Sequence, residues 1–300
     1  MAALVSFPPT VVVAVKALAC ELPRLTGLPL SRLSVADLKR EVLRQGIVAK
    51  VGESTLWRWL NEDAIRPWTH RSWVFPRDPE FGIKAGPILD LYQGLWEGKR
   101  LSPRDFVLSA DEKPSIQARR RKHPSTGPAP KRSMRVEHEY FREGALTYLA
   151  AWDVHRAKVF GTCASRSSIA AFDQLVGDVM SQEPYRSARR VFWIVDNGSI
   201  HRGKPCTERF QRQWPNTIVV HTPTHGSWLN QVEIYFSIVQ RKVLTPNDFS
   251  SLDEVRDRLA GFQVYYQKIA KPFEWKFTRN DLTRLLDRLA KYETCLAPAA

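Results

Sequence analysis

Cysteine is scarce in this sequence of 300 residues, and the four cysteines that occur lie far apart. Cys20, Cys163, Cys206 and Cys295 form no C-x-x-C pair and no cluster with histidine. This spacing argues against a zinc site and gives no support for a disulfide framework. We therefore expect a protein of a reducing compartment, the cytoplasm.

Long apolar runs are also missing. The opening apolar stretch, 11–20, contains Lys16, and no run approaches the roughly 18 residues that a membrane-spanning helix needs. No basic region precedes this stretch, and Pro8 and Pro9 interrupt its start, which argues against a secretory signal peptide. We expect a core helix here, a soluble chain, and no membrane partner.

Acidic residues are outnumbered, with 31 Asp and Glu against 45 Lys and Arg, which gives a net charge of +14. Because 43% of the residues are hydrophobic, this charge belongs to a folded body and not to a disordered tail. The length fits one large or two modest domains. Such an excess of positive charge usually indicates an anionic partner, nucleic acid before membrane.

Residues 1–64 are predicted to form three helices, at about 10–22, 34–45 and 54–63. Ser34 and Asp37 have the spacing of a helix-capping pair, and Gly46 ends the second helix. The pattern fits a DNA-binding helix-turn-helix whose last helix would present Ser54, Thr55 and Arg58 to the major groove. A small helical bundle that touches no DNA fits it equally well.

Residues 65–104 are predicted to be a linker followed by a connecting helix. The stretch 64–80 is too rich in proline and arginine for a regular element, and Arg66 and Arg71 lie within it. A helix is expected at about 82–98.

The remaining residues, 105–300, are predicted to form an α/β domain, because short apolar strands alternate with helices. A mixed sheet with flanking helices is the expected architecture. The strands are expected at 106–110, 145–150, 158–160, 191–195 and 217–220, and the helices at 168–180, 204–214, 228–244 and 252–267.

Three acidic residues are candidates for chemistry. Asp111 and Asp196 each follow a predicted strand directly, and ligands collect at strand ends in open α/β sheets. Glu233 lies in the first turn of a predicted helix. Each also has an ordinary interpretation: a turn for either aspartate, and for Glu233 a capping pair with Asn230.

These residues lie in sequence blocks that resemble the signature blocks of the DDE transposases, closest to the insertion-sequence 630 class of the mariner superfamily. The blocks are FVLSADEK at 106–113, VDNG at 195–198 with His201, and SWLNQVE at 227–233. Thirty-six residues separate Asp196 from Glu233, which suits that class. The segment PFEWKFT at 272–278 resembles its C-terminal block.

The resemblance implies a ribonuclease-H-like fold in which Asp111, Asp196 and Glu233 hold two Mg²⁺ or Mn²⁺ ions. Two such ions can stabilise both the attacking and the leaving oxygen of a phosphodiester displacement. The implied reaction is hydrolysis at the transposon ends, followed by strand transfer of the freed 3′-hydroxyl into target DNA at TA sites.

Neighbouring residues are assigned smaller roles. Asn197, His201 and Asn230 are candidates for orienting the metal ligands, although a turn asparagine and a surface histidine fit as well. Glu112 follows Asp111 on a strand, so we expect it to face the other way and not to be a ligand. Asp153 is assigned to a hairpin turn.

A basic segment at 119–135 follows the first candidate ligand, and we interpret it as a DNA-contacting loop. It contains seven cationic residues and no acid. These residues are Arg119, Arg120, Arg121, Lys122, Lys131, Arg132 and Arg135.

The resemblance also implies partners and a location: double-stranded DNA, comprising terminal inverted repeats and target, a second copy of the chain in a homodimer, and the nucleoid of a bacterial cytoplasm. It favours DNA binding by residues 34–63, which look like the second of two DNA-binding modules, so the chain is expected to be short by one module.

Two alternatives stay open: a repurposed DNA-binding protein without activity, and a ribonuclease-H-like endonuclease without strand transfer. The presence of all three acids argues against the first.

Overall fold

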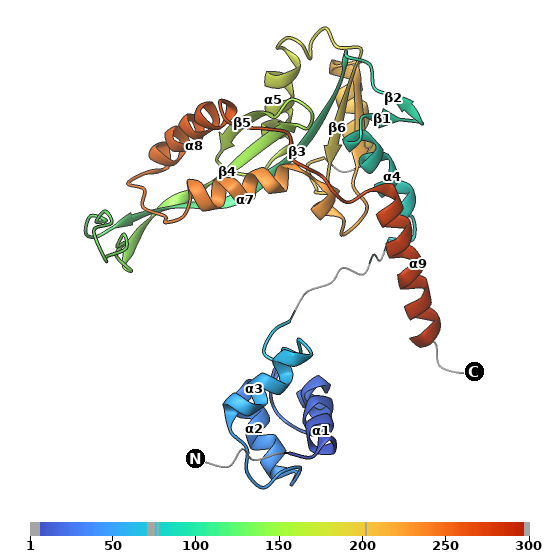
Figure 1. Cartoon of the computed structure of the whole chain (residues 1–300). Coiled ribbons are helices and arrows are strands. Elements are labelled where there is room, and N and C mark those ends of the chain that lie inside the picture. Colours follow the sequence, from blue (N-terminus) through green and yellow to red (C-terminus); the bar gives the residue numbers. More distant parts are fainter. Residues whose placement is uncertain (1–6, 71–75, 77, 202, 297–300) are drawn as a thin grey trace. The chain divides into compact units, whose positions relative to one another are not determined.

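The chain is described by a computed structural model that covers residues 7–70, 76, 78–201 and 203–296 (Figure 1). It divides into two compact units, Met1–Val74 and Phe75–Ala300. No helix in the described part of the chain is long and apolar enough to cross a membrane.

The first unit is helical, as predicted. It contains α1 (Pro9–Cys20), the short 3-10 helix η1 (Pro23–Thr26), α2 (Val35–Arg44) and α3 (Glu53–Glu62). Ser34 and Asp37 form the expected capping box at the start of α2. All three α-helices contribute to one core, in which Val15, Leu38 and Leu56 are fully buried.

The second unit is built on a five-stranded mixed sheet with the strand order β5-β4-β3-β6-β7. The strands β3, β4 and β5 form an antiparallel meander, whereas β6 and β7 run parallel to β3. The predicted mixed sheet is therefore confirmed. Its strands are β3 (Asp105–Arg121), β4 (Tyr140–Asp153), β5 (Lys158–Ala164), β6 (Arg190–Val195) and β7 (Thr217–His221).

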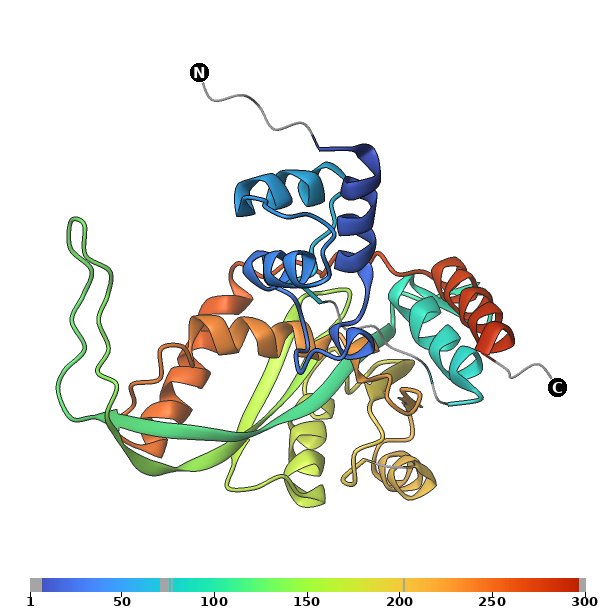
Figure 2. The same cartoon turned by 90° about the horizontal axis from the view of Figure 1, so that it is seen from below.

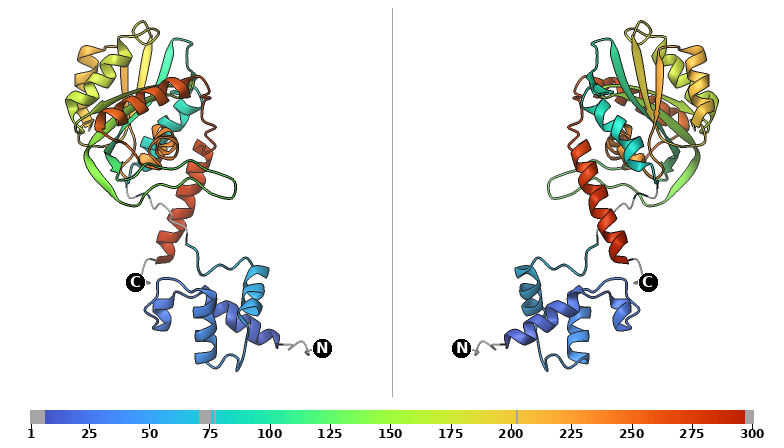
Figure 3. Two further views of the ribbon diagram at one scale, coloured as in Figure 1. Left: turned by 90° about the vertical axis from the view of Figure 1, so that its left-hand side faces the viewer. Right: turned by 90° about the vertical axis from the view of Figure 1, so that its right-hand side faces the viewer.

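Helices cover both faces of this sheet (Figure 3). One core joins the sheet to α5 (Ile169–Met180) and α6 (Gly203–Gln213). The core on the other face is formed by four further helices and by η2 (Ser227–Leu229). These helices are α4 (Phe81–Tyr92), α7 (Val232–Lys242), α8 (Leu252–Gln267) and α9 (Arg279–Leu296).

Two helix predictions need correction. The helix expected at 82–98 ends at Tyr92, because Gly94 adopts a left-handed conformation and a small hairpin of β1 (Leu95–Trp96) and β2 (Lys99–Arg100) follows. The helix expected at 228–244 is interrupted: η2 comes first, Asn230 is extended, and α7 begins at Val232.

The basic segment is not simply a loop, which corrects a further prediction. The strand β3 continues through Arg119, Arg120 and Arg121, which pair with Arg142, Phe141 and Tyr140 of β4. The two strands form a long arm that ends in a hairpin loop (Figures 1 and 2). Acids of β4 and the loop before it neutralise part of the charge, since Arg120 pairs with Glu143 and Lys122 with Glu139.

Candidate active site

Asp111 and Asp196 lie at the same level of two neighbouring strands. The strands β3 and β6 are parallel, and their last paired residues are Ser109 and Ile194. Asp111 and Asp196 each come two residues after this pair. Because side chains alternate along a strand, both aspartates continue the face on which Ser109 and Ile194 lie.

The charge of Asp196 acts on both of the other acids, Asp111 and Glu233. Burial raises the pKa of Asp111 to about 8, and the negative charge of Asp196 contributes to the rise. Partial burial also raises the pKa of Glu233, with a further rise from Asp196, whereas Lys113 opposes it. The structure therefore brings the three predicted acids together at one end of the sheet.

Asn230 fixes the start of α7 against β3. Its amide nitrogen donates to the carbonyl oxygen of Ala110 at 2.9 Å and lies 3.4 Å from a carboxylate oxygen of Asp111. The Ser109 hydroxyl donates to Oδ1 of the Asn230 side chain and accepts from the backbone N–H of Val232 at 2.9 Å. These bonds set the position of Glu233 relative to Asp111.

The capping interpretation of Asn230 and Glu233 is therefore wrong. The Asn230 side chain does not cap α7, because it is fully buried and bonded to β3; the N–H of Val232, the first residue of α7, donates to the Ser109 hydroxyl instead. Glu233 is exposed as a residue, and among the described residues its carboxylate makes no hydrogen bond back to the N–H of Asn230. Asn230 thus lies between Ala110 and Asp111 at the end of β3, where it contacts one of the predicted acids.

Asn197 and His201 belong to the turn that follows β6. The Asn197 amide donates to the carbonyl oxygen of Thr222, so it ties this turn to the end of β7 and does not face the acids. His201 is fully buried, and its Nδ1 lies 3.0 Å from the Asp196 carbonyl oxygen and 3.1 Å from Oδ1 of the Asp196 carboxylate. The surface-histidine alternative is therefore wrong.

Glu112 is part of the same cluster, which the sequence did not predict. Glu112 does lie on the opposite face of β3 from Asp111, as alternation predicts. Leu108 and Ala110 pack in the core with α5 and α6, and Glu112 is two residues further along the same face. His201 nevertheless reaches this side, with Nε2 3.2 Å from a Glu112 oxygen. Ligand atoms of Asp111, Glu112 and His201 all lie within 4.8 Å of one another.

The charge of His201 is set by these acids. Burial alone lowers its pKa, but the neighbouring carboxylates of Glu112 and Asp196 outweigh burial and raise the pKa. Asp153, which was assigned to the hairpin turn, is the last residue of β4, and its carboxylate accepts from the turn N–H groups of His155 and Arg156.

The predicted DNA contacts lie on two separate surfaces. On the helical unit, Ser54, Arg58 and Arg66 are exposed and Thr55 is half-buried, while Arg71 lies outside the described residues. Trp57 on α3 is also exposed, by 51%.

On the arm, the basic residues differ in their surroundings. Arg121 donates to the backbone oxygens of Asn247 at 2.9 Å and Glu137 at 2.8 Å, so it holds the arm together. The guanidinium of Arg119 lies over the ring of Tyr140. Three exposed residues remain at the hairpin loop: Lys131, Arg132 and Arg135.

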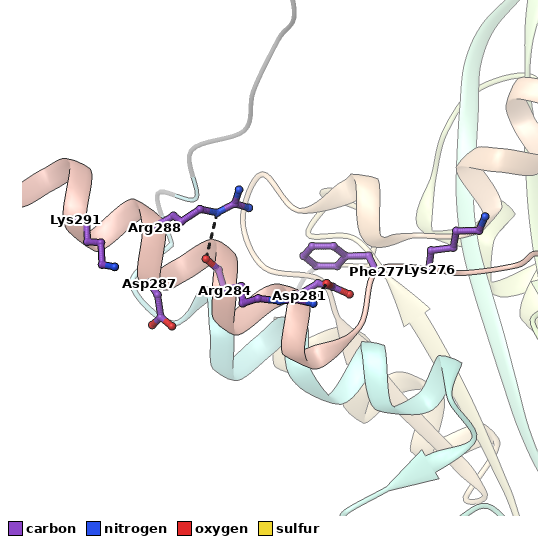
Figure 4. Close-up of a pocket in the computed structure, with 7 residues that line it drawn as sticks. All are labelled: Lys276, Phe277, Asp281, Arg284, Asp287, Arg288 and Lys291. Carbon is purple, nitrogen blue, oxygen red and sulfur yellow. Dashed lines mark hydrogen bonds and ion pairs between the residues drawn. The ribbon is translucent and has the colours of Figure 1, made fainter.

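A separate hollow lies beside α9 (Figure 4). One of its two acids is engaged locally, since Asp281 accepts from Thr278 and pairs with Arg284 at 2.7 Å. Among the described residues, no group of three acidic or histidine ligands lies there. The residues that line this hollow are Lys276, Phe277, Asp281, Arg284, Asp287, Arg288 and Lys291.

Solved structures of the Mos1 transposase share this fold. A paired-end complex with Mn is 14% identical, covers 97% of this chain and 80% of its own, and has a TM-score of 0.56. A paired-end complex with the left transposon end is 13% identical, covers 95% and 79%, and has a TM-score of 0.53. The strand transfer complex is 13% identical, covers 95% and 78%, and has a TM-score of 0.52. The ribonuclease-H-like architecture expected from the sequence is therefore confirmed.

Sequence comparison gives the family. No curated protein sequence matches the chain. The family model described as DDE superfamily endonuclease matches residues 107–256, which is half of the chain and includes Asp111, Asp196 and Glu233. The chain therefore belongs to the DDE superfamily of endonucleases.

Proposed function

We propose that this protein is a DNA transposase of the mariner type that cuts phosphodiester bonds at transposon ends and joins the freed ends to target DNA. The observation that carries the proposal is the convergence of Asp111, Asp196 and Glu233 at one end of the sheet. The similar Mos1 structures include a paired-end complex and a strand transfer complex, which supports both halves of the reaction.

The donor atoms fit a hard divalent cation. Asp111, Asp196 and Glu233 offer carboxylate oxygens, the ligands that Mg²⁺ and Mn²⁺ prefer. Mos1 structures contain Mn or Mg. We infer that these three residues hold two such ions, which when bound supply charge stabilisation to the attacking and leaving oxygens.

The residues of the chain place and polarise the reacting groups. In the first reaction the oxygen of water attacks phosphorus, the bond from phosphorus to the 3′ oxygen breaks, and that oxygen leaves as a 3′-hydroxyl. In the second, this hydroxyl attacks a target phosphodiester and displaces a target 3′-hydroxyl. Ser109 and Asn230 hold Asp111 and the start of α7 in fixed relation during both steps.

DNA would reach this site through the two basic surfaces. On α3 and beyond, Ser54, Thr55, Arg58, Arg66 and Arg71 would bind the terminal inverted repeats, and the exposed Trp57 extends this surface. On the arm, Lys131, Arg132 and Arg135 are free to meet phosphates. The paired ends of the Mos1 complexes support a homodimer. We also propose that the protein belongs to the insertion-sequence 630 class, that it inserts at TA sites, and that it acts in a bacterial nucleoid.

The test is an assay with DNA that carries the inverted repeats flanking the gene. Purified protein with Mg²⁺ or Mn²⁺ is expected to nick these ends and to join them into a plasmid at TA sites. Nicked ends without joined products would favour an endonuclease without strand transfer. DNA binding without any cleavage would favour the inactive DNA-binding protein.

A further inference from the structure

Four side chains form a continuous chain of polar contacts at the candidate metal site. The Ser167 hydroxyl donates to one carboxylate oxygen of Glu112 at 3.0 Å. The other oxygen of Glu112 lies 3.2 Å from Nε2 of His201. Nδ1 of His201 is hydrogen-bonded to the backbone carbonyl oxygen of Asp196 at 3.0 Å and lies 3.1 Å from Oδ1 of the Asp196 carboxylate, as an ion-pair contact. The chain thus links β3 and the segment before α5 to the turn that follows β6.

The central member of this chain has little freedom to move. His201 has no exposed surface, and its ring lies 4.9 Å from the ring of Phe172 on α5. The turn around it is equally tight, because the backbone N–H of Gly198 donates to Oδ1 of Asp196 at 2.6 Å. A side chain at position 198 would lie 3.0 Å from the His201 ring.

We propose that Glu112 and His201 act as one positioning unit that fixes the carboxylate of Asp196 for metal binding. The inference rests on the proposed function, since it assigns these residues a role at the same site. Without the unit, the partly exposed Asp196 carboxylate would be held by the Gly198 N–H. Metal sites lose affinity for their ions when the hydrogen bonds that support the ligands are removed.

The geometry favours this role over direct metal binding by Glu112 and His201. Both nitrogens of His201 are already engaged, Nε2 by a Glu112 oxygen and Nδ1 by the backbone carbonyl oxygen of Asp196, so neither has an open direction toward a cation. One oxygen of Glu112 faces Ser167 and the other faces His201. Each group is therefore engaged by another side chain, as expected of residues that support ligands.

The test measures the affinity of the full chain for Mn²⁺ by titration calorimetry, without any activity assay. Glu112→Ala and His201→Ala are each expected to weaken Mn²⁺ binding by about 10- to 100-fold. The double variant should lose no more than the more damaged single variant, because both changes break one unit. Losses that multiply in the double variant, or an unchanged affinity in Glu112→Ala, would overturn the proposal.

A conservative variant separates position from charge. The Glu112→Gln amide can keep a bond to Ser167 and one to His201, so it should recover most of the lost affinity. If Glu112→Gln binds as weakly as Glu112→Ala, the carboxylate charge itself is needed, and positioning by hydrogen bonds is overturned. A thermal melting curve shows whether each alanine variant is folded. If Glu112→Ala does not fold, Glu112→Gln still tests the proposal.

Two further variants complete the design. Glu208→Gln removes an exposed acid of α6 that pairs with Lys204, and it should bind Mn²⁺ as the parent does. Asp196→Asn should lose binding if the metal site is correct. Normal binding by Asp196→Asn would refute the proposed metal site itself, whereas a normal Glu112→Ala beside a damaged Asp196→Asn would refute the positioning unit alone.

Discussion

Asp111 is a carboxyl group that is 6% exposed and holds its proton unusually strongly. Its pKa is raised to about 8 from an ordinary value of 3.8, by burial first and then by the charge of Asp196. A cation that binds here must replace this proton. A buried acid next to a second acid is therefore both a destabilising feature of the metal-free chain and a prepared site for a divalent ion.

This pKa predicts opposite pH trends for stability and for metal binding. The folded, metal-free chain keeps a proton at Asp111 that the unfolded chain has lost, so the free energy of unfolding should fall between about pH 4 and pH 8. Apparent Mn²⁺ affinity should rise by about tenfold per pH unit toward pH 8 as one proton is displaced. Calorimetry in two buffers of different ionisation enthalpy measures this proton, and binding without proton release from pH 6 to 7 would contradict the assignment.

Gly198 is the second residue whose identity the site requires. An added Cβ would lie 2.8 Å from Oδ1 of Asp196 and 3.0 Å from the His201 ring, so one of these groups must move. Gly198→Ala is expected to weaken Mn²⁺ binding by about tenfold or more. It should also destabilise the fold by about 1–3 kcal/mol through overpacking, as measured by denaturant unfolding.

Gly177→Ala is the matched control for this change. Gly177 lies within α5, and an added Cβ meets no atom within 4 Å. The same substitution should raise stability there by about 0.5–1 kcal/mol and leave Mn²⁺ binding unchanged. Equal effects of the two substitutions on Mn²⁺ affinity would show that the tight turn around Asp196 is unimportant.

At the scale of elements, the sequence predicts what local patterns determine. The buried strand β6 and the helices α5 and α8 were predicted within a few residues, because their apolar patterns are local; the structure adds that Ser168 and Ser251 cap the two helices. The three acids were found because two follow strands and one starts a helix.

What was missed depends on contacts between distant segments. The arm was interpreted as a loop because Arg119, Arg120 and Arg121 give no apolar alternation, and their pairing depends on β4. Glu112 was not expected at the site, because alternation along β3 places it on the face opposite Asp111. Alternation cannot predict that His201, from the turn after β6, contacts Glu112 on that face. The helix α9 was also not predicted. It is anchored by Arg279, which pairs with Asp90 of α4.

The arm divides its cations into structural and exposed ones, which gives a prediction for DNA binding. Replacing Lys131, Arg132 and Arg135 with Ala should lower the slope of log affinity against log salt by up to about 3, since each lost phosphate contact contributes roughly 0.9. Filter binding over a series of salt concentrations measures the slope. An unchanged slope would mean that the hairpin loop does not touch DNA.

The matched control removes the same charge from the opposite end of the sheet. Arg104, Arg186 and Arg189 lie where β3 and β6 begin, away from the acids. Their triple replacement with Ala should leave the salt slope near that of the parent. Arg121→Ala, in contrast, should destabilise the arm, because Arg121 bonds to three backbone oxygens.

The whole molecule divides its tasks between two units that have separate hydrophobic cores. The helical unit offers α3 with an exposed tryptophan and arginine, a surface suited to reading DNA. The larger unit holds the acids, the positioning bonds and the basic arm. Within the arm, Arg120 and Lys122 are neutralised by Glu143 and Glu139, whereas Lys131, Arg132 and Arg135 are exposed.

The central claim is that Asp111, Asp196 and Glu233 form one metal-dependent centre for DNA cleavage. The most direct measurement compares Mn²⁺-dependent cleavage of the inverted-repeat DNA by the parent, Asp196→Asn and Glu208→Gln. The parent and Glu208→Gln should cleave at the same rate, and Asp196→Asn should fall below detection while still binding the DNA. An Asp196→Asn protein that cleaves as fast as the parent would contradict the account.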